Sequence, residues 1–224
     1  MNFNKKNYFK IVKYLNQILL SNSINNFKYN IPFLFLNREH PVFLSRYISK
    51  ENHKLKFFLR NLYHVFYKLF CSLFPRNIKS DFDSLPKKVD FLFVSHLTNV
   101  NQIKNLDDQY FGNVINDLVE KNFKCLVIYI NHTNYKKQYL TNKTKSLNKF
   151  IIPKNANFLS EIQFLFNSYK GYTNLKMFKE NYNEIFKQLK YEIFSIDTIG
   201  VLRFKFFYNK ILNKINPSFV VSTF

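Results

Sequence analysis

The chain has 224 residues, a formal net charge of +20 and a hydrophobic share of 46%. Such a hydrophobic share supports a packed core and argues against intrinsic disorder. The positive charge favours an anionic membrane or nucleic acid as a partner, but the excess is nearly all lysine, and only five residues are arginine. Because sequence-specific readers of nucleic acid depend on the arginine fork, nucleic acid is the less expected of these partners.

Cysteine usage and the search for targeting signals indicate the cellular compartment. Cys71 and Cys125 are isolated in the sequence, which argues against a structural zinc site and suits a reducing compartment. The first apolar stretch is interrupted by Lys10 and Lys13, so it matches a signal peptide poorly. No uncharged apolar run reaches the roughly 18 residues that a membrane-spanning helix needs. These features predict a cytoplasmic protein.

Residues 1–85 are predicted to form a mainly helical segment. Apolar side chains recur at helical spacing over residues 11–19, whereas residues 31–36 suit either a short strand or a buried turn. The clearest helix spans residues 55–74. It is closed by Pro75, which opens a linker that runs to residue 87.

The predicted helix at residues 55–74 carries a basic stripe. Its members lie four residues apart, at Lys56, Arg60, His64 and Lys68. One interpretation is peripheral attachment to the inner face of the membrane, with Lys56, Arg60 and Lys68 on anionic headgroups and the apolar side in the interface. The other interpretation is an ordinary solvated face, with the apolar side packed into the core.

From Val89 onward, short apolar runs alternate with helical periodicity. The predicted strands are residues 89–96, 124–130, 150–152 and 219–223, and the predicted helices lie around residues 111–119, 162–166, 178–189 and 199–215. This alternation predicts an α/β fold over residues 86–224, with a Rossmann-like parallel sheet and flanking helices. Because the chain stops inside its last apolar strand, we expect the sheet to be incomplete and the domain to be truncated at its C-terminus.

Polar residues gather where the first two predicted strands end. His96, Asn99, Asp107 and Asp108 follow the first strand, and Asn131 and His132 follow the second. Ligands of open parallel sheets bind beyond the carboxyl ends of the strands, so His96 and His132 face one crevice if these strands are neighbours. His96 is the candidate general base, with Asp107 or Asp108 holding its imidazole. Asn99, Asp107, Asn131 and His132 are the candidate ligand-binding residues.

Each of these residues also has a structural interpretation. Asp107 and Asp108 precede a helix, where carboxylates satisfy free backbone amides. His96 suits a hydrogen bond to the loop backbone, and Asn131 with His132 suits a simple turn. The sequence leaves both interpretations open.

Several chemistries lack the residues that they require. The chain has no glycine between the first predicted strand and Gly112, so the glycine-rich turns of dinucleotide sites and P-loops are absent. A Gly-x-Ser-x-Gly nucleophile elbow and repeated carboxylate motifs for metal are absent as well. We therefore expect neither a cofactor nor a bound metal.

Four short segments together resemble a family of bacterial surface carbohydrate (O-antigen or capsule) biosynthesis proteins, which look like two-domain GT-B-type glycosyltransferases. The segments are residues 91–97, 108–112, 127–133 and 216–224. The resemblance implies that residues 89–224 are the acceptor-side half, with His96 as the base and a saccharide or lipid-linked acceptor. It also implies that a nucleotide-sugar donor binds only with a second domain, so that this fragment is inactive alone. The alternative is a non-catalytic basic module that binds an anionic membrane or nucleic acid.

Overall fold

The computed structural model describes residues 13, 54–74, 82–83, 85–104, 108–133, 139–141, 146–175 and 194–223. Apart from Lys13, which is helical, the predictions for residues 11–19 and 31–36 lie outside the described residues, and so does the helix predicted at 178–189. Asp107 lies outside them too.

The described residues fall into two compact units. Those within Met1–Phe74 and Asn157–Arg203 form the first, here called the helical unit, and those within Pro75–Ala156 and Phe204–Phe224 form the second, here called the α/β unit. Helix α11 (Ile196–Leu212) contributes its first turns to the helical unit and the remainder to the α/β unit. The division at residue 85 that the sequence suggests stays a prediction.

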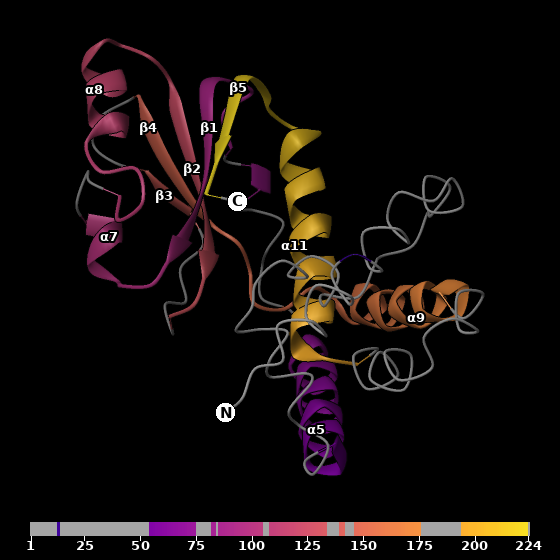
Figure 1. The fold of residues 1–224 in the computed structure, drawn as a ribbon. Coiled ribbons are helices and arrows are strands. Elements are labelled where there is room, and N and C mark those ends of the chain that lie inside the picture. Colours follow the sequence, from indigo (N-terminus) through magenta and orange to yellow (C-terminus); the bar gives the residue numbers. More distant parts are fainter. Residues whose placement is uncertain are drawn as a thin grey trace. The chain divides into compact units, whose positions relative to one another are not determined.

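One five-stranded sheet forms the centre of the α/β unit (Figure 1). The strand order is β3-β4-β2-β1-β5, with β1 (Lys88–Leu97), β2 (Cys125–Asn131), β3 (Tyr139–Thr141), β4 (Leu147–Ile151) and β5 (Asn216–Ser222). All four predicted strands are present and run parallel, which confirms the α/β prediction. The short edge strand β3 runs antiparallel to β4, and it was not among the predicted strands.

Helices cover both faces of this sheet. On one face, Phe93, Val127 and other strand residues pack with Ile103 of α7 (Asn101–Lys104) and Ile115 of α8 (Val114–Glu120). On the other face, Phe150 of β4 contacts Phe82, with ring centroids 5.0 Å apart, and Phe82 stacks on Phe207 of α11 at 5.8 Å. Burial on both faces explains why β1 and β2 are almost continuously apolar.

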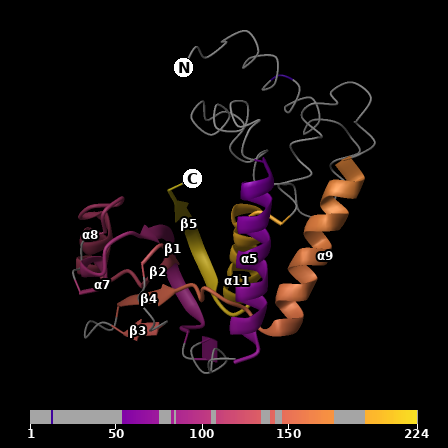
Figure 2. The same cartoon turned by 90° about the horizontal axis from the view of Figure 1, so that it is seen from below.

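The helical unit contains α5 (Lys54–Ser72), α9 (Phe158–Leu175) and the first turns of α11 (Figure 2). Helix α9 begins where the Asn157 side chain accepts a hydrogen bond from the Ser160 amide, at 2.9 Å. Ser195 starts α11 in the same way, because its Oγ accepts from the Thr198 amide at 3.0 Å. None of the helices described here is both long and apolar enough to span a bilayer.

Candidate functional site

The carboxyl ends of β1 and β2 lie side by side. The two strands are paired in parallel up to Leu97 and Asn131, and the His132 amide donates a hydrogen bond to the Leu97 carbonyl at 3.0 Å. The chain leaves both strands at the same edge of the sheet, which is where open α/β sheets bind ligands. His96 is the penultimate residue of β1, and His132 directly follows β2.

The two histidine side chains meet at this edge. Nδ1 of His96 lies 2.7 Å from Nε2 of His132, and the ring planes are 24° apart. At this distance one nitrogen carries the proton and the other presents its lone pair. The pair therefore shares one proton at this contact. The ring of Tyr110 lies against His96, with centroids 5.6 Å apart.

The environment favours neutral imidazoles. Burial lowers the pKa of His96, and the positive charge that His132 can carry lowers it further, whereas the nearby Asp108 carboxylate opposes the shift. Burial also lowers the pKa of His132, with a smaller contribution from Lys154. Both rings therefore favour the unprotonated form at pH 7, which is the form that accepts a proton from a substrate.

Asp108 is buried, and its carboxylate organises the loop between β1 and α8. Its oxygens accept hydrogen bonds from Ser95 Oγ at 2.9 and 3.0 Å and from the amides of Tyr110 and Phe111 at 2.9 and 3.2 Å. A backbone bridge between Asp108 and Gly112 closes the turn, and Gly112 adopts a φ of 53° that favours glycine. Neither carboxylate oxygen bonds to His96, so Asp108 acts on the imidazole through charge and through the position of Tyr110.

The two candidate asparagines take part in local turns. Asn99 Oδ1 accepts a hydrogen bond from the Asn101 amide at 2.9 Å. Asn131 Oδ1 accepts from both the amide and the hydroxyl of Thr133, each at 2.9 Å. These are the turn bonds that asparagine commonly makes. They fix the backbone on either side of the histidine pair.

Sequence reasoning did not find Gln102 and Lys149. Gln102 Oε1 accepts hydrogen bonds from the Thr98 and Asn99 amides, each at 2.9 Å, while its Nε2 donates to the His96 carbonyl at 3.1 Å. Lys149 is 1% exposed, and its ammonium donates to the Gln102 carbonyl at 2.8 Å. Both residues hold α7 and the loop after His96 in place. Neither position carries a sequence signal, because each contact depends on the folded path of the loop.

The basic stripe on α5 does not form a single surface. Lys56 belongs to α5, but its side chain lies outside the described residues. Arg60 is exposed, whereas His64 and Lys68 are half-buried and line a pocket of the helical unit. The face of α5 most open to solvent is instead aromatic and aliphatic. Five residues of α5 are each more than half exposed, namely Leu59, Tyr63, Phe66, Tyr67 and Phe70, and Leu73 and Phe74 just past its end are exposed to a similar extent.

Within the described part of the chain, no three His, Cys, Asp or Glu side chains are grouped so that they could hold a metal ion. Comparison with protein-family models, with curated proteins and with solved structures gives no match. The fold and the strand-end histidine pair therefore carry the functional argument.

Proposed function

We propose that the α/β unit is the acceptor-binding half of a glycosyltransferase-like protein of surface polysaccharide synthesis. The observation that carries this proposal is the 2.7 Å contact between His96 and His132 at the carboxyl ends of two neighbouring parallel strands. Open parallel sheets bind their ligands at this edge, and in this proposal the two imidazoles supply a base there. The proposed acceptor is a saccharide, free or lipid-linked.

Both nitrogens of each ring have a task in this mechanism. A sugar hydroxyl is a weak nucleophile, so its oxygen must lose a proton as it attacks the donor. Nε2 of His96 takes that proton, and the proton on Nδ1 passes to Nε2 of His132 across the 2.7 Å contact. His132 then releases the proton on its Nδ1 to water. The net change is one proton moved from the hydroxyl to solvent. Both imidazoles are then neutral in the opposite tautomers, and proton exchange with water restores the starting tautomers before the next turnover.

Binding of the nucleotide-sugar donor requires residues other than the histidine pair. A nucleotide-sugar needs contacts for its diphosphate, and the loop after β1 has no glycine-rich phosphate-binding turn. In this proposal a second α/β domain holds the donor, and the present chain contributes the acceptor side and the base.

Acceptor binding can be tested on the chain as it exists. Saccharides are titrated into isotopically labelled protein while the ring signals of His96 and His132 are followed by NMR. We expect these two signals to shift together. His96→Gln or His132→Gln should weaken binding while the amide spectrum remains that of a folded protein. His64→Gln, in the helical unit, is the matched control and should bind normally. Ring signals that do not respond to any saccharide at millimolar concentration would argue against an acceptor site.

A second candidate function is attachment to an anionic membrane surface, and the exposed face of α5 favours it. Residues 59, 63, 66 and 70 of that face are three or four apart, so they form one stripe along the helix. Aromatic side chains prefer the boundary between water and lipid, and Arg60 borders the stripe as an exposed cation. Each aromatic ring that enters the interface contributes up to roughly 1.5–3 kcal/mol.

Vesicle co-sedimentation tests this second function. The chain should bind vesicles with anionic lipid more strongly than neutral vesicles, and Phe66→Gln with Phe70→Gln should reduce binding about tenfold or more. Phe219→Gln is the control, because Phe219 of β5 is exposed to a similar extent, 61% against 65% for Phe66. Equal binding to both vesicle types, or no loss in the double variant, would remove α5 as a membrane contact.

A further inference from the structure

Tyr110 presents an open aromatic surface beside the histidine pair. Its ring lies against the His96 ring, with centroids 5.6 Å and planes 53° apart, and the residue is still 49% exposed. Among the described phenylalanines and tyrosines of the α/β unit, two others are more than a third exposed: Phe123 just before β2 and Phe219 within β5. Tyr110 is therefore the exposed ring of this group that adjoins His96 at the carboxyl end of β1.

The turn that carries Tyr110 is tied to β1 at two points. The buried Asp108 carboxylate accepts hydrogen bonds from the Ser95 hydroxyl and from the Tyr110 amide, each at 2.9 Å. The hydroxyl of Thr98, the first residue after β1, donates to Oε1 of Gln109. Because tyrosine has only two side-chain torsions, a fixed backbone leaves its ring few positions. The ring is thus in place before a ligand binds, which lowers the entropic cost of binding.

Such a ring suits the ligand that the proposed function requires. A pyranose presents C–H groups on the faces of its ring and hydroxyls around its rim. It therefore stacks a face on an aromatic ring while its hydroxyls remain available to polar partners, such as the neighbouring imidazole. A nucleobase also stacks on aromatic rings, but the base itself carries no alcohol hydroxyl for His96 to deprotonate.

We propose that Tyr110 is the platform on which the acceptor binds, and that the acceptor presents a pyranose whose C–H face stacks on the Tyr110 ring with one hydroxyl directed at His96. This inference rests on the proposed function, which makes the ligand of this edge an acceptor sugar. It makes Tyr110 a binding residue, separate from the two imidazoles that move the proton. Loss of the aromatic ring should therefore weaken binding, whereas loss of the phenolic hydroxyl alone should not.

Methyl β-glucopyranoside and methyl β-galactopyranoside are the probes, and mannitol, an open-chain polyol without a ring face, is their counterpart. Titrated into the full chain at millimolar concentration, a pyranoside should shift the NMR ring signals of Tyr110 and His96. It should also give nuclear Overhauser effects between the Tyr110 ring protons and the protons on one face of the sugar, and mannitol should give neither. Tyr110→Leu should weaken binding about three- to tenfold, the range expected for one lost aromatic contact, and Tyr110→Phe should bind normally.

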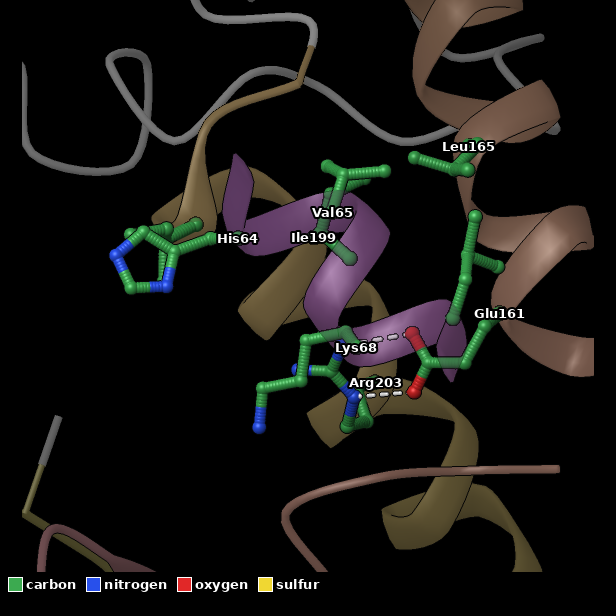
Figure 3. Close-up of a pocket in the computed structure, with 9 residues that line it drawn as sticks. His64, Val65, Lys68, Glu161, Leu165, Ile199 and Arg203 are labelled. Atoms are coloured by element: carbon green, nitrogen blue, oxygen red, sulfur yellow. Dashed lines mark hydrogen bonds and ion pairs between the residues drawn. The ribbon is translucent and has the colours of Figure 1, made fainter. Parts of the chain in front are cut away.

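Two variants serve as matched controls. Phe123→Leu removes an exposed ring of the same unit that precedes β2. His64→Gln changes an imidazole that lines a pocket of the helical unit (Figure 3). Both variants should bind the pyranosides as tightly as the unchanged chain.

The inference is overturned if a pyranoside shifts the signals of His96 and His132 while Tyr110→Leu leaves the affinity unchanged, a result that the proposed function would survive. It is also overturned if uridine binds the Tyr110 ring more tightly than either pyranoside, because the edge would then be a nucleobase site. If neither pyranoside binds, the acceptor site of the proposed function fails, and the role of Tyr110 fails with it.

Discussion

The buried ion pair of Glu161 with Arg203 gives the most quantitative prediction for the helical unit. Only 3% of the Glu161 side chain and 11% of the Arg203 side chain are exposed, so either charge is largely cut off from water when its partner is removed. Breaking such a pair typically costs about 3–5 kcal/mol, whereas replacing both partners with apolar residues is often neutral. Arg203→Met removes the two-bond partner of the more buried charge, so we expect it to cost more than Glu161→Leu, about 4–5 against about 3 kcal/mol.

The free energy of unfolding is measured in urea, with hydrogen exchange of the backbone amides of α9 and α11 as the readout. This local readout is needed because a chain with two compact units need not unfold in one step. The double variant Glu161→Leu with Arg203→Met should recover most of the stability lost by either single variant. Asp83→Asn is the control, since the Asp83–Lys214 pair of the α/β unit is exposed and should contribute less than about 1 kcal/mol. Single variants that cost no more than the control, or a double variant that costs the sum of the two, would refute this reasoning.

Three further predictions concern the α/β unit. Because burial lowers the pKa of His96 and of His132, the unfolded chain takes up protons that the folded chain does not, and stability should fall as the pH drops below about 6.5 toward the lowered pKa values. Denaturation at pH 8 and pH 5 measures this loss, which the double variant His96→Asn with His132→Asn should reduce. By NMR titration, His132→Gln should raise the pKa of His96, whereas Asp108→Asn should lower it, since these neighbours act in opposite directions. Leu92→Ala, at a position of β1 with no exposed surface, should destabilise the unit by about 2–5 kcal/mol in urea titration, while the exposed Val220→Ala should have little effect.

Strands β1, β2 and β4 were predictable because each is a short apolar run that is largely buried, whereas the mostly exposed β5 was predictable from its apolar run alone. The segment Cys125–Asn131 is buried along most of its length, so its β-branched and aromatic residues could be recognised without alternation. The edge strand Tyr139–Thr141 was not predictable, because three residues between polar loops carry too little pattern. Helix α9 extends beyond both ends of the predicted segment at 162–166. The added residues were not recognised because exposed positions such as Leu159 add no periodic signal.

The candidate site was predictable only in part. Parallel neighbours bring their carboxyl ends together, so the approach of His96 to His132 follows from recognising two strands and placing them side by side. The contact between Ser95 and Asp108 joins residues 13 apart in the sequence, and that between Glu161 and Arg203 joins residues 42 apart. No periodicity in the sequence encodes such separations, because they depend on how loops and helices return in three dimensions. The ion pair of Glu161 with Arg203 could therefore not be predicted from the sequence.

The buried polar groups of the α/β unit are concentrated around the loop that follows His96. Ser95, Gln102, Asp108 and Lys149 are each less than 9% exposed, and each contributes to a hydrogen bond within this region. The Tyr129 hydroxyl is also buried beside Asp108 and makes no hydrogen bond among the described residues, and burial together with the negative charge of Asp108 raises its pKa.

Burying polar groups is costly unless they are paired, so a fold that needed only a core would place apolar residues at these positions. What this network achieves is a fixed path for the chain directly after His96, together with a fixed turn at residues 108–112. The path sets the position of one imidazole, and the backbone bond from His132 to Leu97 sets the position of the other. Two imidazoles held in contact by separate rigid supports are the arrangement that proton transfer requires, and this is the strongest structural reason to look for chemistry at the ends of β1 and β2.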